Sequence, residues 1–460
     1  MLILFSAENY RSIAGEQTLS MVASKQCGRE RDKERRAIRE NKLIRERLPG
    51  LANTSYLRTA AVYGSNASGK TTLVSAIGLM RTMVNTSAAN SNRKGLLYYP
   101  FKLDQGYAER PTTFFVSFVW GGIRYEYEFS YNERAIVSES LYSFPKGRPR
   151  KIFMRSAGEN GPEINAPGFR AGKAVASLLN DDCLFLSFIY AHPNFAGYES
   201  VKNVGDFFER GLIVIDGGLD GFSRTTRVLE GSEGTDRQRM MMRKLVSGAD
   251  VGITDAEVRE EGFFERAIRL RDAAGKTADQ YAREAEAEAM RPPEGIGTSK
   301  RVVFTHGAGD GQHEFEAYEE SLGTRRLFDL SGYIAQAYET DATLVVDGLD
   351  SSLHPLLALN IINLFQSKAA VGSHAQLVFT AHQIAFLMND VLDRDQIWFT
   401  KKGDVGNMSL YPLSDYSPRK GESIWKGYLL GRYDAVPLIP DMFGIVPNEP
   451  GVDEEAGVEQ

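Results

Sequence analysis

Two glycines, a lysine and a threonine stand at fixed spacing in residues 64–71, which read Gly-Ser-Asn-Ala-Ser-Gly-Lys-Thr. The pattern G-x-x-x-x-G-K-T is that of a phosphate-binding loop. Gly64 and Gly69 let the backbone curl so that successive N–H groups point at phosphate oxygens. Lys70 would reach the β- and γ-phosphates, and the Thr71 hydroxyl would hold Mg²⁺. The alternative is a Gly/Ser loop with a chance lysine, and the flanking residues discriminate between the two.

The flanking residues have the required pattern. Residues 61–63 read as the end of a buried strand, and 72–80 read as a helix with an apolar face. A phosphate-binding loop requires a strand before it and a helix after it, and that helix adds its positive N-terminal end to the site. We therefore interpret 64–71 as a site for a nucleoside triphosphate with Mg²⁺.

A carboxylate suited to the same metal ion occurs much later in the chain. Residues 344–346 form an apolar run that ends in Asp347. A carboxylate at the end of a buried strand beside a phosphate-binding loop holds Mg²⁺ through water. Asp347 is therefore the second predicted metal residue, together with Thr71.

Two further motifs lie on either side of Asp347. Upstream, Ser321 and Gly323 form an S-x-G motif that opens an amphipathic helix predicted over 320–338. Downstream, an apolar strand within 376–387 runs into Thr380 and His382. The alternatives are a simple capping serine for Ser321 and a structural strand-end histidine for His382.

The elements around these motifs suggest three parts and a tail. Strand-like residues open the chain, and 112–131 reads as a β-hairpin around a Gly-Gly turn. From about 171 to 300 the pattern becomes helical and charged, most clearly over 255–291, and 301–320 reads as another strand pair. We predict an N-terminal ATPase lobe with a β-meander over 1–155, a helical insert with a linker over 156–300, a C-terminal ATPase lobe over 301–447, and a disordered acidic tail over 448–460.

Composition places the chain among globular proteins of a reducing compartment. Of its 460 residues, 42% are hydrophobic and 25% are charged, which is ordinary for a soluble protein. No apolar run is long enough to cross a membrane, and the N-terminus lacks the features of a signal peptide. Two cysteines are too few for a disulfide framework. We expect a cytoplasmic protein without a membrane partner.

The net charge of −6 disfavours a general polyanion binder, but local basic stretches remain. Residues 29–47 interleave nine basic and five acidic side chains, which is typical of a solvated helix face; a phosphate-contacting surface is the alternative. Residues 146–151, Lys-Gly-Arg-Pro-Arg-Lys, are a second basic stretch and read as a hairpin turn.

The order of these motifs resembles a known group of ATPases. A phosphate-binding loop near the N-terminus, a long insert, S-x-G, a strand-end Asp, Asp-Ser-Ser-x-His-Pro at 350–355 and a strand-end His are found in that order in ABC-type ATPase heads of the RecF, SMC and OLD (overcoming lysogenization defect) group. The chain also resembles stand-alone bacterial "AAA family ATP-binding proteins" of phage-defence loci in its start, FSAENYRSI, and in residues 424–437. The resemblance covers nearly the whole chain and is weakest at 200–300. It implies an α/β fold, a P-loop NTPase head of ABC type with an attached antiparallel β-meander and a helical insert.

In that group two heads close head-to-tail on two ATP molecules, which implies a homodimer here. The resemblance also implies which residues contact the nucleotide. Ser321 and Gly323 of one protomer would cap the γ-phosphate bound by the other, Asp350 would lie at the protomer interface, and His382 would contact the γ-phosphate. Asn9 and Arg11 would approach from the first strand. The residues expected to hold phosphates are Gly64, Ser65, Asn66, Gly69, Lys70, Thr71 and Thr72, and those expected to act in catalysis are Lys70, Asp347 and His382.

One residue departs from the group's pattern. Asp-Glu normally ends the strand, and the Glu positions the attacking water, whereas here Asp347 is followed by Gly348. Glycine has no group that takes a proton, so general-base help worth ~10²–10⁴-fold would be missing. Asp350, His354 or His382 could substitute in part. The alternative is an ATP-bound clamp with slow turnover.

Three functions fit these features. The first is a nucleotide-gated ATPase subunit of a bacterial anti-phage system that controls a separate effector, such as a nuclease, because about 75 residues after His382 are too few for the nuclease domain of OLD proteins. The second is a RecF-like or SMC-like repair ATPase that clamps DNA, and the third is an ATP-dependent scaffold that does not hydrolyse ATP. Analogy with the group favours the first.

Overall fold

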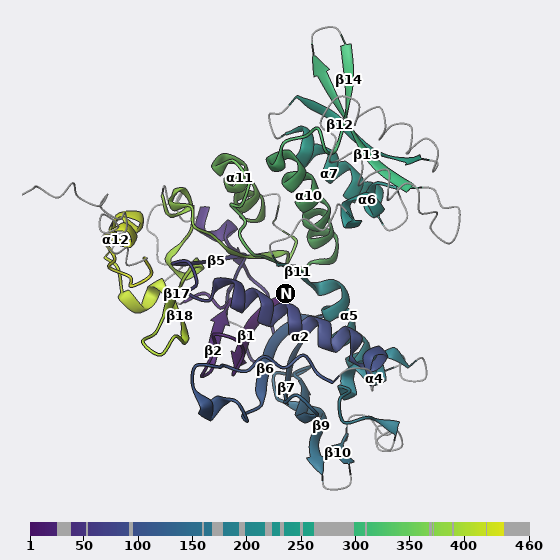
Figure 1. The fold of residues 1–460 in the computed structure, drawn as a ribbon, viewed down its shortest axis with the longest axis vertical. Helices are drawn as coiled ribbons and strands as arrows, with labels where there is room; N and C mark the ends of the chain where they lie inside the picture. The colour runs from purple at the N-terminus through teal and green to yellow at the C-terminus, as the bar shows by residue number, and fades with distance from the viewer. Residues whose placement is uncertain are drawn as a thin grey trace, which may run out of the picture.

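A six-stranded sheet forms the centre of the molecule (Figure 1). The computed structural model describes residues 1–24, 38–51, 54–91, 95–158, 161–167, 178–192, 198–216, 223–230, 234–248, 252–261, 299–308, 311–367, 370, 372–388, 391–419 and 421–436. In spatial order the central strands are β11 (Leu212–Ile215), β15 (Thr343–Val346), β16 (Gln376–Thr380), β5 (Thr59–Gly64), β17 (Ile397–Lys402) and β18 (Met408–Pro412).

The direction of these strands brings the predicted motifs to one edge of the sheet. The first five strands are mutually parallel, and only β18 is antiparallel to its neighbour. The carboxyl ends of parallel strands meet at the same edge. Gly64 ends β5, Asp347 follows β15 and Thr380 ends the strand between them, β16. Three segments that are far apart in the sequence therefore converge.

Each face of the central sheet is buried against a different layer. Ala60, Val62 and Val345 belong to one core cluster, and the alternate residues Ala61 and Val346 belong to another. Side chains alternate between the faces of a strand, so both faces of these strands are apolar, as expected for a parallel sheet covered on both sides. One face packs on α2 (Lys70–Asn90), and the other on α10 (Leu322–Thr340) and α11 (Pro355–Phe365).

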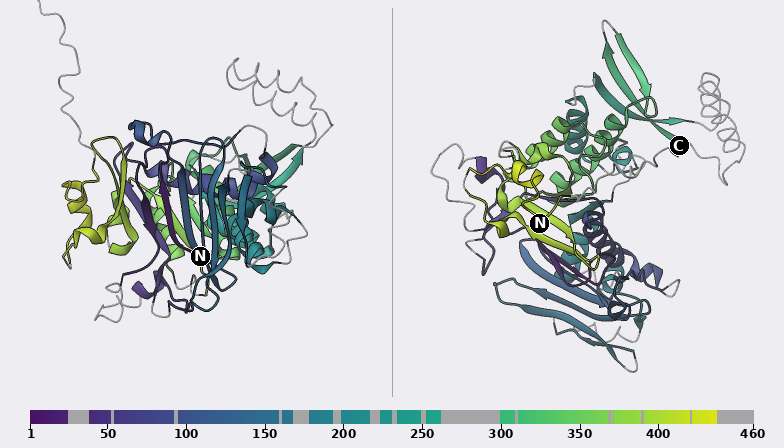
Figure 2. Two further views of the ribbon diagram at one scale, coloured as in Figure 1. Left: turned by 90° about the horizontal axis from the view of Figure 1, so that it is seen from below. Right: turned by 60° about the vertical axis from the view of Figure 1, so that its left-hand side comes forward.

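An antiparallel sheet lies on the far side of α2, so the helix is held between two sheets (Figure 1). Its strands run side by side in the left view of Figure 2. The hairpin predicted over 112–131 forms its centre, with the turn at Gly121-Gly122 as expected. In spatial order its strands are β10 (Gly161–Asn165), β9 (Arg150–Gly158), β8 (Ile136–Ser143), β7 (Ile123–Tyr131), β6 (Thr112–Trp120), β1 (Leu2–Glu8) and β2 (Gln17–Ser20).

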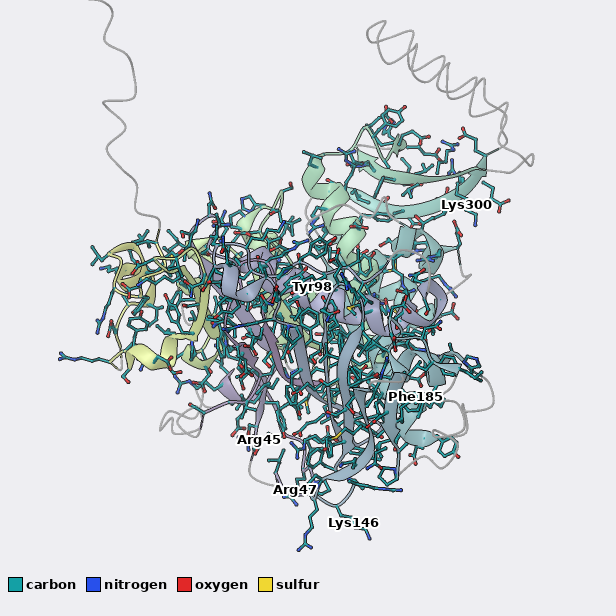
Figure 3. All side chains as sticks on the ribbon, turned by 60° about the horizontal axis from the view of Figure 1, so that its bottom comes forward. Arg45, Arg47, Tyr98, Lys146, Phe185 and Lys300 are labelled. Carbon is teal, nitrogen blue, oxygen red and sulfur yellow. The ribbon has the colours of Figure 1, made fainter. Side chains whose placement is uncertain are left out.

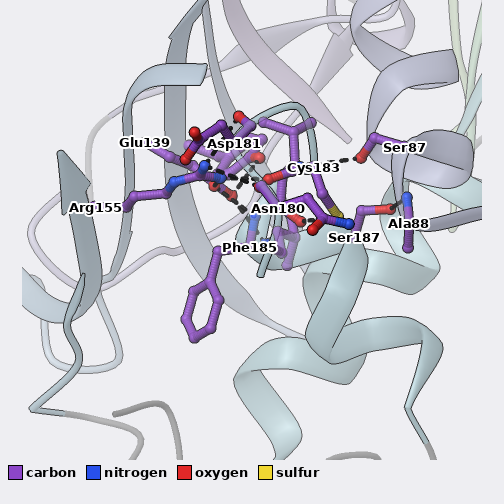
Figure 4. A network of polar contacts seen from close by, with 12 residues as sticks. Ser87, Ala88, Glu139, Arg155, Asn180, Asp181, Cys183, Phe185 and Ser187 are labelled. Atoms are coloured by element: carbon purple, nitrogen blue, oxygen red, sulfur yellow. Dashed lines mark hydrogen bonds and ion pairs between the residues drawn. The ribbon is translucent and has the colours of Figure 1, made fainter. Parts of the chain in front are cut away.

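A buried polar network fixes the far end of α2 to this sheet (Figure 4). The fully buried Glu139 carboxylate accepts hydrogen bonds from the backbone N–H groups of Phe185 (2.7 Å) and Leu186 (2.9 Å). The Ser87 hydroxyl on α2 accepts the N–H of Leu184 at 3.2 Å. Arg155, also buried, donates to the carbonyl of Asp181 at 3.1 Å. The segment after residue 180 therefore joins the helix that follows the phosphate-binding loop to β8 and β9.

A smaller sheet lies next to α10 at the top of Figure 1. It consists of β12 (Ile253–Glu261), β13 (Ser299–Ala308) and β14 (Gly311–Glu316), in that order. Helices α6 (Ser223–Leu229) and α7 (Asp236–Ser247) pack between it and α10. The remaining elements are the strand pair β3 (Leu43–Ile44) and β4 (Tyr56–Leu57), and helices α4 (Phe185–Ala191), α5 (Glu199–Asp206) and α12 (Ile424–Leu429).

The predicted fold class is confirmed, but two details of the predicted helical insert are wrong. Residues 255–261 were predicted as helix and form part of β12. The reason is tertiary: β12 pairs with β13 along its length, and Arg259 forms an ion pair with Glu314 of β14. Cross-strand pairing overrides local helix preference. The apolar run 212–215 is also a strand, β11, of the central sheet.

The basic stretch 29–47 differs from a single solvated helix face. Residues 29–37 lie outside the described residues; 38–41 are helical, and the chain then enters β3. Lys42 is buried, with its ammonium 3.4 Å from the carboxylate of Asp393. The predicted linker at 292–298 and the predicted tail at 448–460 also lie outside the described residues. None of the helices described is long and apolar enough to cross a bilayer.

Candidate nucleotide-binding site

The loop between β5 and α2 is shaped so that only glycine fits at both ends. Gly69 has φ 110° and would place a Cβ 2.4 Å from the sulfur of Met408. A Cβ on Gly64 would lie 2.2 Å from the Thr400 hydroxyl. The Ser68 hydroxyl bonds to the same Thr400 hydroxyl at 2.6 Å. The loop is therefore packed tightly on β17 and β18, which leaves its other side for a ligand.

Lys70 is the buried cation of this loop. Its ammonium donates to the carbonyls of Gly64 (2.7 Å) and Ser65 (2.9 Å), so the side chain folds back over the loop. Burial lowers the pKa of Lys70 to about 8, although Asp347 and Asp350 act in the opposite direction. A cation held in this way lies where phosphate oxygens of a bound nucleotide could replace the carbonyls.

The two predicted metal residues are in direct contact. The Thr71 hydroxyl donates to Oδ2 of Asp347 at 2.7 Å. The other carboxylate oxygen, Oδ1, accepts the hydroxyl of Thr380 at 2.6 Å, and that hydroxyl accepts the N–H of Gly348 at 2.7 Å. A hydroxyl from the first turn of α2 and a carboxylate from the end of β15 form a donor set that suits Mg²⁺.

Asp350 fixes the position of His382. Its Oδ2 accepts the backbone N–H groups of His382 (2.7 Å) and Gln383 (2.8 Å). The Tyr63 hydroxyl, from the end of β5, donates to the Gln383 carbonyl at 3.1 Å. Partial burial and the charge of Lys70 lower the pKa of His382. A neutral imidazole is therefore the favoured form of this exposed side chain near the loop.

The two residues predicted to approach from the first strand have different roles. Asn9 is buried; its amide donates to the carbonyls of Tyr107 (3.0 Å) and Arg110 (2.6 Å), and its oxygen accepts the N–H of Phe101. Its side chain thus holds the 101–111 loop in place. Arg11 is exposed and donates to the hydroxyl of Ser75 on α2 at 3.3 Å. Of the two, only Arg11 has an exposed side chain beside α2.

The S-x-G motif stands at the start of α10, as predicted. Ser321 caps the helix by accepting the N–H of Thr324 at 3.1 Å, which also agrees with the capping alternative. Helix α10 precedes β15 in the chain and runs antiparallel to it. The 19 residues of the helix span about 28 Å, whereas the four residues of the strand span about 13 Å. The helix start therefore projects beyond the sheet edge that carries the loop.

The segment after Asp347 lies against this projecting helix start. A Cβ on Gly323 would lie 2.8 Å from the carbonyl oxygen of Ser352, so only glycine allows this approach. His354 caps α11, with its Nδ1 accepting the N–H of Leu356.

Sequence patterns did not identify three residues that support the loop, namely Ser12, Thr400 and Met408. Ser12 donates its hydroxyl to that of Thr72 at 2.9 Å and so joins the β1–β2 turn to α2. Met408 and Thr400 form the wall beneath the glycines. These contacts involve ordinary residue types on distant segments, so no local signal could have revealed them. The donor set that was predicted does fit ATP with Mg²⁺, because two glycine-only backbone positions, an ammonium, a hydroxyl and a carboxylate surround one helix N-terminus.

The lowered pKa of Lys70 leads to a pH-dependent prediction. Only the ammonium form attracts phosphate, and with a pKa of about 8 the free protein is mostly charged at pH 7 and mostly neutral at pH 9. Binding must then take up a proton, so the Kd for ATP-Mg²⁺ should rise about tenfold from pH 7 to pH 9. Calorimetric titration measures this, with Lys70→Arg as the control whose cation does not titrate. An equal Kd at both pH values in the wild type would contradict the assignment.

Comparisons with known proteins agree with this geometry. A sequence profile of the family described as "AAA domain, putative AbiEii toxin, Type IV TA system" matches residues 60–171 and 222–389, more than half of the chain. The match includes the phosphate-binding loop, the S-x-G motif and the strand ends at Asp347 and Thr380. No curated protein sequence matches the chain.

Two solved structures resemble the chain at low sequence identity. One is an SMC head domain from Thermotoga maritima, with 13% identity, a TM-score of 0.38, and coverage of 89% of this chain and 98% of that one. The other is an SmcHead bound to the C-winged helix domain of ScpA, with 11% identity, a TM-score of 0.42, and coverage of 90% and 99%. The profile match, together with the phosphate-binding loop between β5 and α2, identifies an ATPase domain of the P-loop fold.

Proposed function

Because the chain belongs to the family described as "AAA domain, putative AbiEii toxin, Type IV TA system", we propose that it is an ATP-gated subunit of a bacterial anti-phage defence system. It binds ATP with Mg²⁺, forms a head-to-tail homodimer around two nucleotides, and controls a separate effector. The family's description, which names a toxin of a toxin–antitoxin pair, supports a controlled toxic output. The defence role rests on that family analogy.

The observation that supports the proposal is that the phosphate-binding loop and the S-x-G motif stand at two separate places on one chain, both at the same edge of the central sheet. Lys70, Thr71 and Asp347 form one half around the N-terminus of α2. Ser321 and Gly323 form the other half at the exposed start of α10, which projects past the same sheet edge. A second copy, turned head-to-tail, would supply its α10 N-terminus to the γ-phosphate on the first.

Within one half-site the proposed roles follow from the contacts. Gly64, Ser65, Asn66, Gly69 and Thr72 present the loop backbone and the helix start to the phosphates. Lys70 exchanges its loop carbonyls for phosphate oxygens, and Thr71 with Asp347 holds Mg²⁺. His382, set in place by Asp350, faces the γ-phosphate. Arg11 approaches from the β1–β2 turn.

Mixing two inactive variants tests whether the site is shared. Lys70→Ala spoils the loop and Ser321→Arg spoils the S-x-G half, so each homodimer has two defective sites. A mixed dimer pairs one intact loop with one intact S-x-G. If the two sites are independent, a 1:1 mixture should recover roughly a quarter of wild-type ATPase activity when pairing is random, and about half when only mixed dimers form. ATP turnover of the mixture against each variant alone measures this. Verified mixed dimers without any recovery would contradict head-to-tail sharing.

A second candidate function is the DNA-clamping ATPase, and a basic surface favours it. Exposed cationic side chains from two distant segments lie together at the lower edge of Figure 3, where Arg45, Arg47 and Lys146 are labelled. The two segments touch: a Cβ on Gly147 would lie 2.7 Å from the backbone nitrogen of Gly50. Arg148 and Arg150 extend the surface along the start of β9.

A DNA-binding measurement separates the two functions. If this surface clamps DNA, duplex binding should require ATP and weaken steeply as salt rises, because phosphate contacts release counterions. Arg47→Glu with Lys146→Glu should then remove it while leaving ATP binding intact. Duplex binding that is absent at low salt, with and without ATP, would rule out the DNA-clamping function.

A further inference from the structure

Glu320, the residue before Ser321 of the S-x-G motif, is held in place by a histidine on strand β13. Oε1 of Glu320 lies 2.5 Å from Nε2 of His306, which belongs to β13. The contact is well shielded, since the side chain of Glu320 is 8% exposed and that of His306 is 20% exposed. A shielded hydrogen bond of this kind holds its partners in one geometry more firmly than an exposed one does.

The histidine is itself fixed by the β13–β14 hairpin. It lies opposite His313 in the strand register, and its ring packs edge-on against Phe315 at 4.7 Å between ring centroids. The turn that leads from β14 towards Ser321 is closed twice: the N–H of Glu316 donates to the Glu319 carboxylate at 2.8 Å, and the N–H of Glu319 donates to the Glu316 carbonyl at 2.9 Å. The hairpin is thus a firm base for Glu320.

Ser321 receives its position from both sides. On its C-terminal side the hydroxyl bonds to Thr324, and Gly323 lies against the Ser352 carbonyl. On its N-terminal side Glu320 is the last anchored residue before the exposed serine. Without the His306 contact, only the backbone of the turn at residues 316–319 would hold the N-terminal side of Ser321 in place.

We propose that His306 is a positioning residue for Ser321, which it acts on through Glu320. The proposal rests on the proposed function, because Ser321 matters for turnover only if it serves a nucleotide bound by a partner copy. Through this contact the β12–β13–β14 sheet controls the second half of the shared site. His306 touches neither the loop nor the metal residues of its own protomer, so its effect falls on turnover and not on ATP binding.

Kinetics of single variants give the first test. His306→Ala should lower kcat about tenfold, because misplacing a positioning group by about 1 Å costs up to about a hundredfold. Its KM for ATP and its ATP-induced thermal shift should stay within about twofold of wild type. His306→Gln, whose amide can still donate to Glu320, should restore most of kcat. The matched control is His313→Ala, an exposed residue opposite His306 on the same hairpin, which should change nothing.

A second variant, Glu320→Ala, keeps the test valid if His306→Ala has a folding defect. If His306→Ala melts at a lower temperature without nucleotide, the lost packing on Phe315 is responsible, and Glu320→Ala removes the same contact while keeping the ring. Glu320→Ala should give the same loss of kcat. An unchanged kcat in both variants, or a loss of the ATP-induced thermal shift in either, would overturn the positioning role.

Mixed dimers give the decisive test, in which protein mass is measured in addition to ATP turnover. His306→Ala mixed with Lys70→Ala should turn over faster than either alone, since one site then combines an intact loop with an intact S-x-G half. His306→Ala mixed with Ser321→Arg should not improve, because both lesions affect the same half. Each mixture should be checked for ATP-dependent mixed dimers by mass measurement.

The reference mixture of Lys70→Ala with Ser321→Arg separates the two levels of failure. If the reference recovers and His306→Ala fails to behave as a lesion of the Ser321 half, only the positioning role is wrong. If the reference itself does not recover in verified mixed dimers, the shared site is wrong and the role of His306 is overturned with it.

Discussion

Replacing Lys70 by alanine is expected to abolish ATP binding and to lower ATP turnover by at least about a hundredfold. Lys70 supplies the one mobile cation of the loop, and its ammonium already lies on the carbonyls of Gly64 and Ser65. A ligand present at about 100 times its Kd stabilises the folded protein by about 2.7 kcal/mol. The variant should therefore lose the rise in melting temperature that ATP-Mg²⁺ gives the wild type.

Lys70→Met is the matched variant for this experiment, because the side chain is buried and methionine keeps most of its packing. Both variants should melt like the wild type without nucleotide. If Lys70→Met still gained as much thermal stability from ATP-Mg²⁺ as the wild type, the loop would not be the nucleotide site.

Gly348→Glu is expected to raise kcat by at least about tenfold, equivalent to about 1.4 kcal/mol of barrier, with little change in KM. In the proposed site Thr71 and Asp347, which are in contact, would hold Mg²⁺ and Lys70 would hold the phosphates, so binding would not need the glutamate. What glycine lacks is a group that orients water, which matters more in the transition state than in the ground state. The wild type should therefore hydrolyse ATP slowly.

The geometry at Gly348 determines how this variant should be made. Its φ is 63°, a left-handed conformation that costs a non-glycine residue about 1–2 kcal/mol. A Cβ there would also lie 2.4 Å from the hydroxyl of Ser351, while the Ser351 Cβ is 3.5 Å away. Only the hydroxyl interferes, so Gly348→Glu combined with Ser351→Ala makes room for the side chain.

Gly348→Gln in the same Ser351→Ala background is the control, because it has the same size and backbone strain without the carboxylate. Single-turnover and steady-state ATPase assays should show acceleration with Glu and none with Gln. A folded Glu variant with unchanged kcat would point to His382 or Asp350 as the group that handles water. A wild type that turns over as fast as the Glu variant would contradict the slow-hydrolysis account as well.

The sequence was sufficient for the motifs that are local in the chain. Gly64 to Thr71 between a strand and a helix, Asp347 after an apolar run, and Ser321 before an amphipathic helix all occupy the expected elements. Each of these signals arises within a few residues, from backbone geometry or from hydrophobic periodicity. That is why their placement could be predicted without an alignment.

Features that depend on tertiary pairing could not be predicted. Residues 255–261 have helical composition but form β12, because β13 provides a pairing edge that only the folded chain supplies. Strand β11, four apolar residues long, has no periodicity that distinguishes it from a buried helix segment. Asn9 was placed near the nucleotide by resemblance, yet its amide serves the 101–111 loop. The domain boundaries stay a prediction.

The contact of Asp350 with the backbone at His382 is the least expected part of the candidate site. Asp350 was predicted at a protomer interface, and in the structure it first of all orders the strand end that carries His382. A carboxylate that contacts a partner copy and also the backbone at His382 would shift His382 when the partner copy binds. In the proposed head-to-tail dimer, this carboxylate would join the two halves of the site.

Light-scattering mass of the wild-type protein, with and without ATP-Mg²⁺, tests the central claim most directly. The claim is that ATP holds two copies head-to-tail and that slow hydrolysis keeps them together. The account predicts a single-copy mass without nucleotide or with ADP and twice that mass with ATP, persisting for many minutes. It also predicts that Lys70→Ala and Ser321→Arg, each alone, stay at the single-copy mass with ATP. A wild-type mass that is the same with ATP, with ADP and without nucleotide would contradict it.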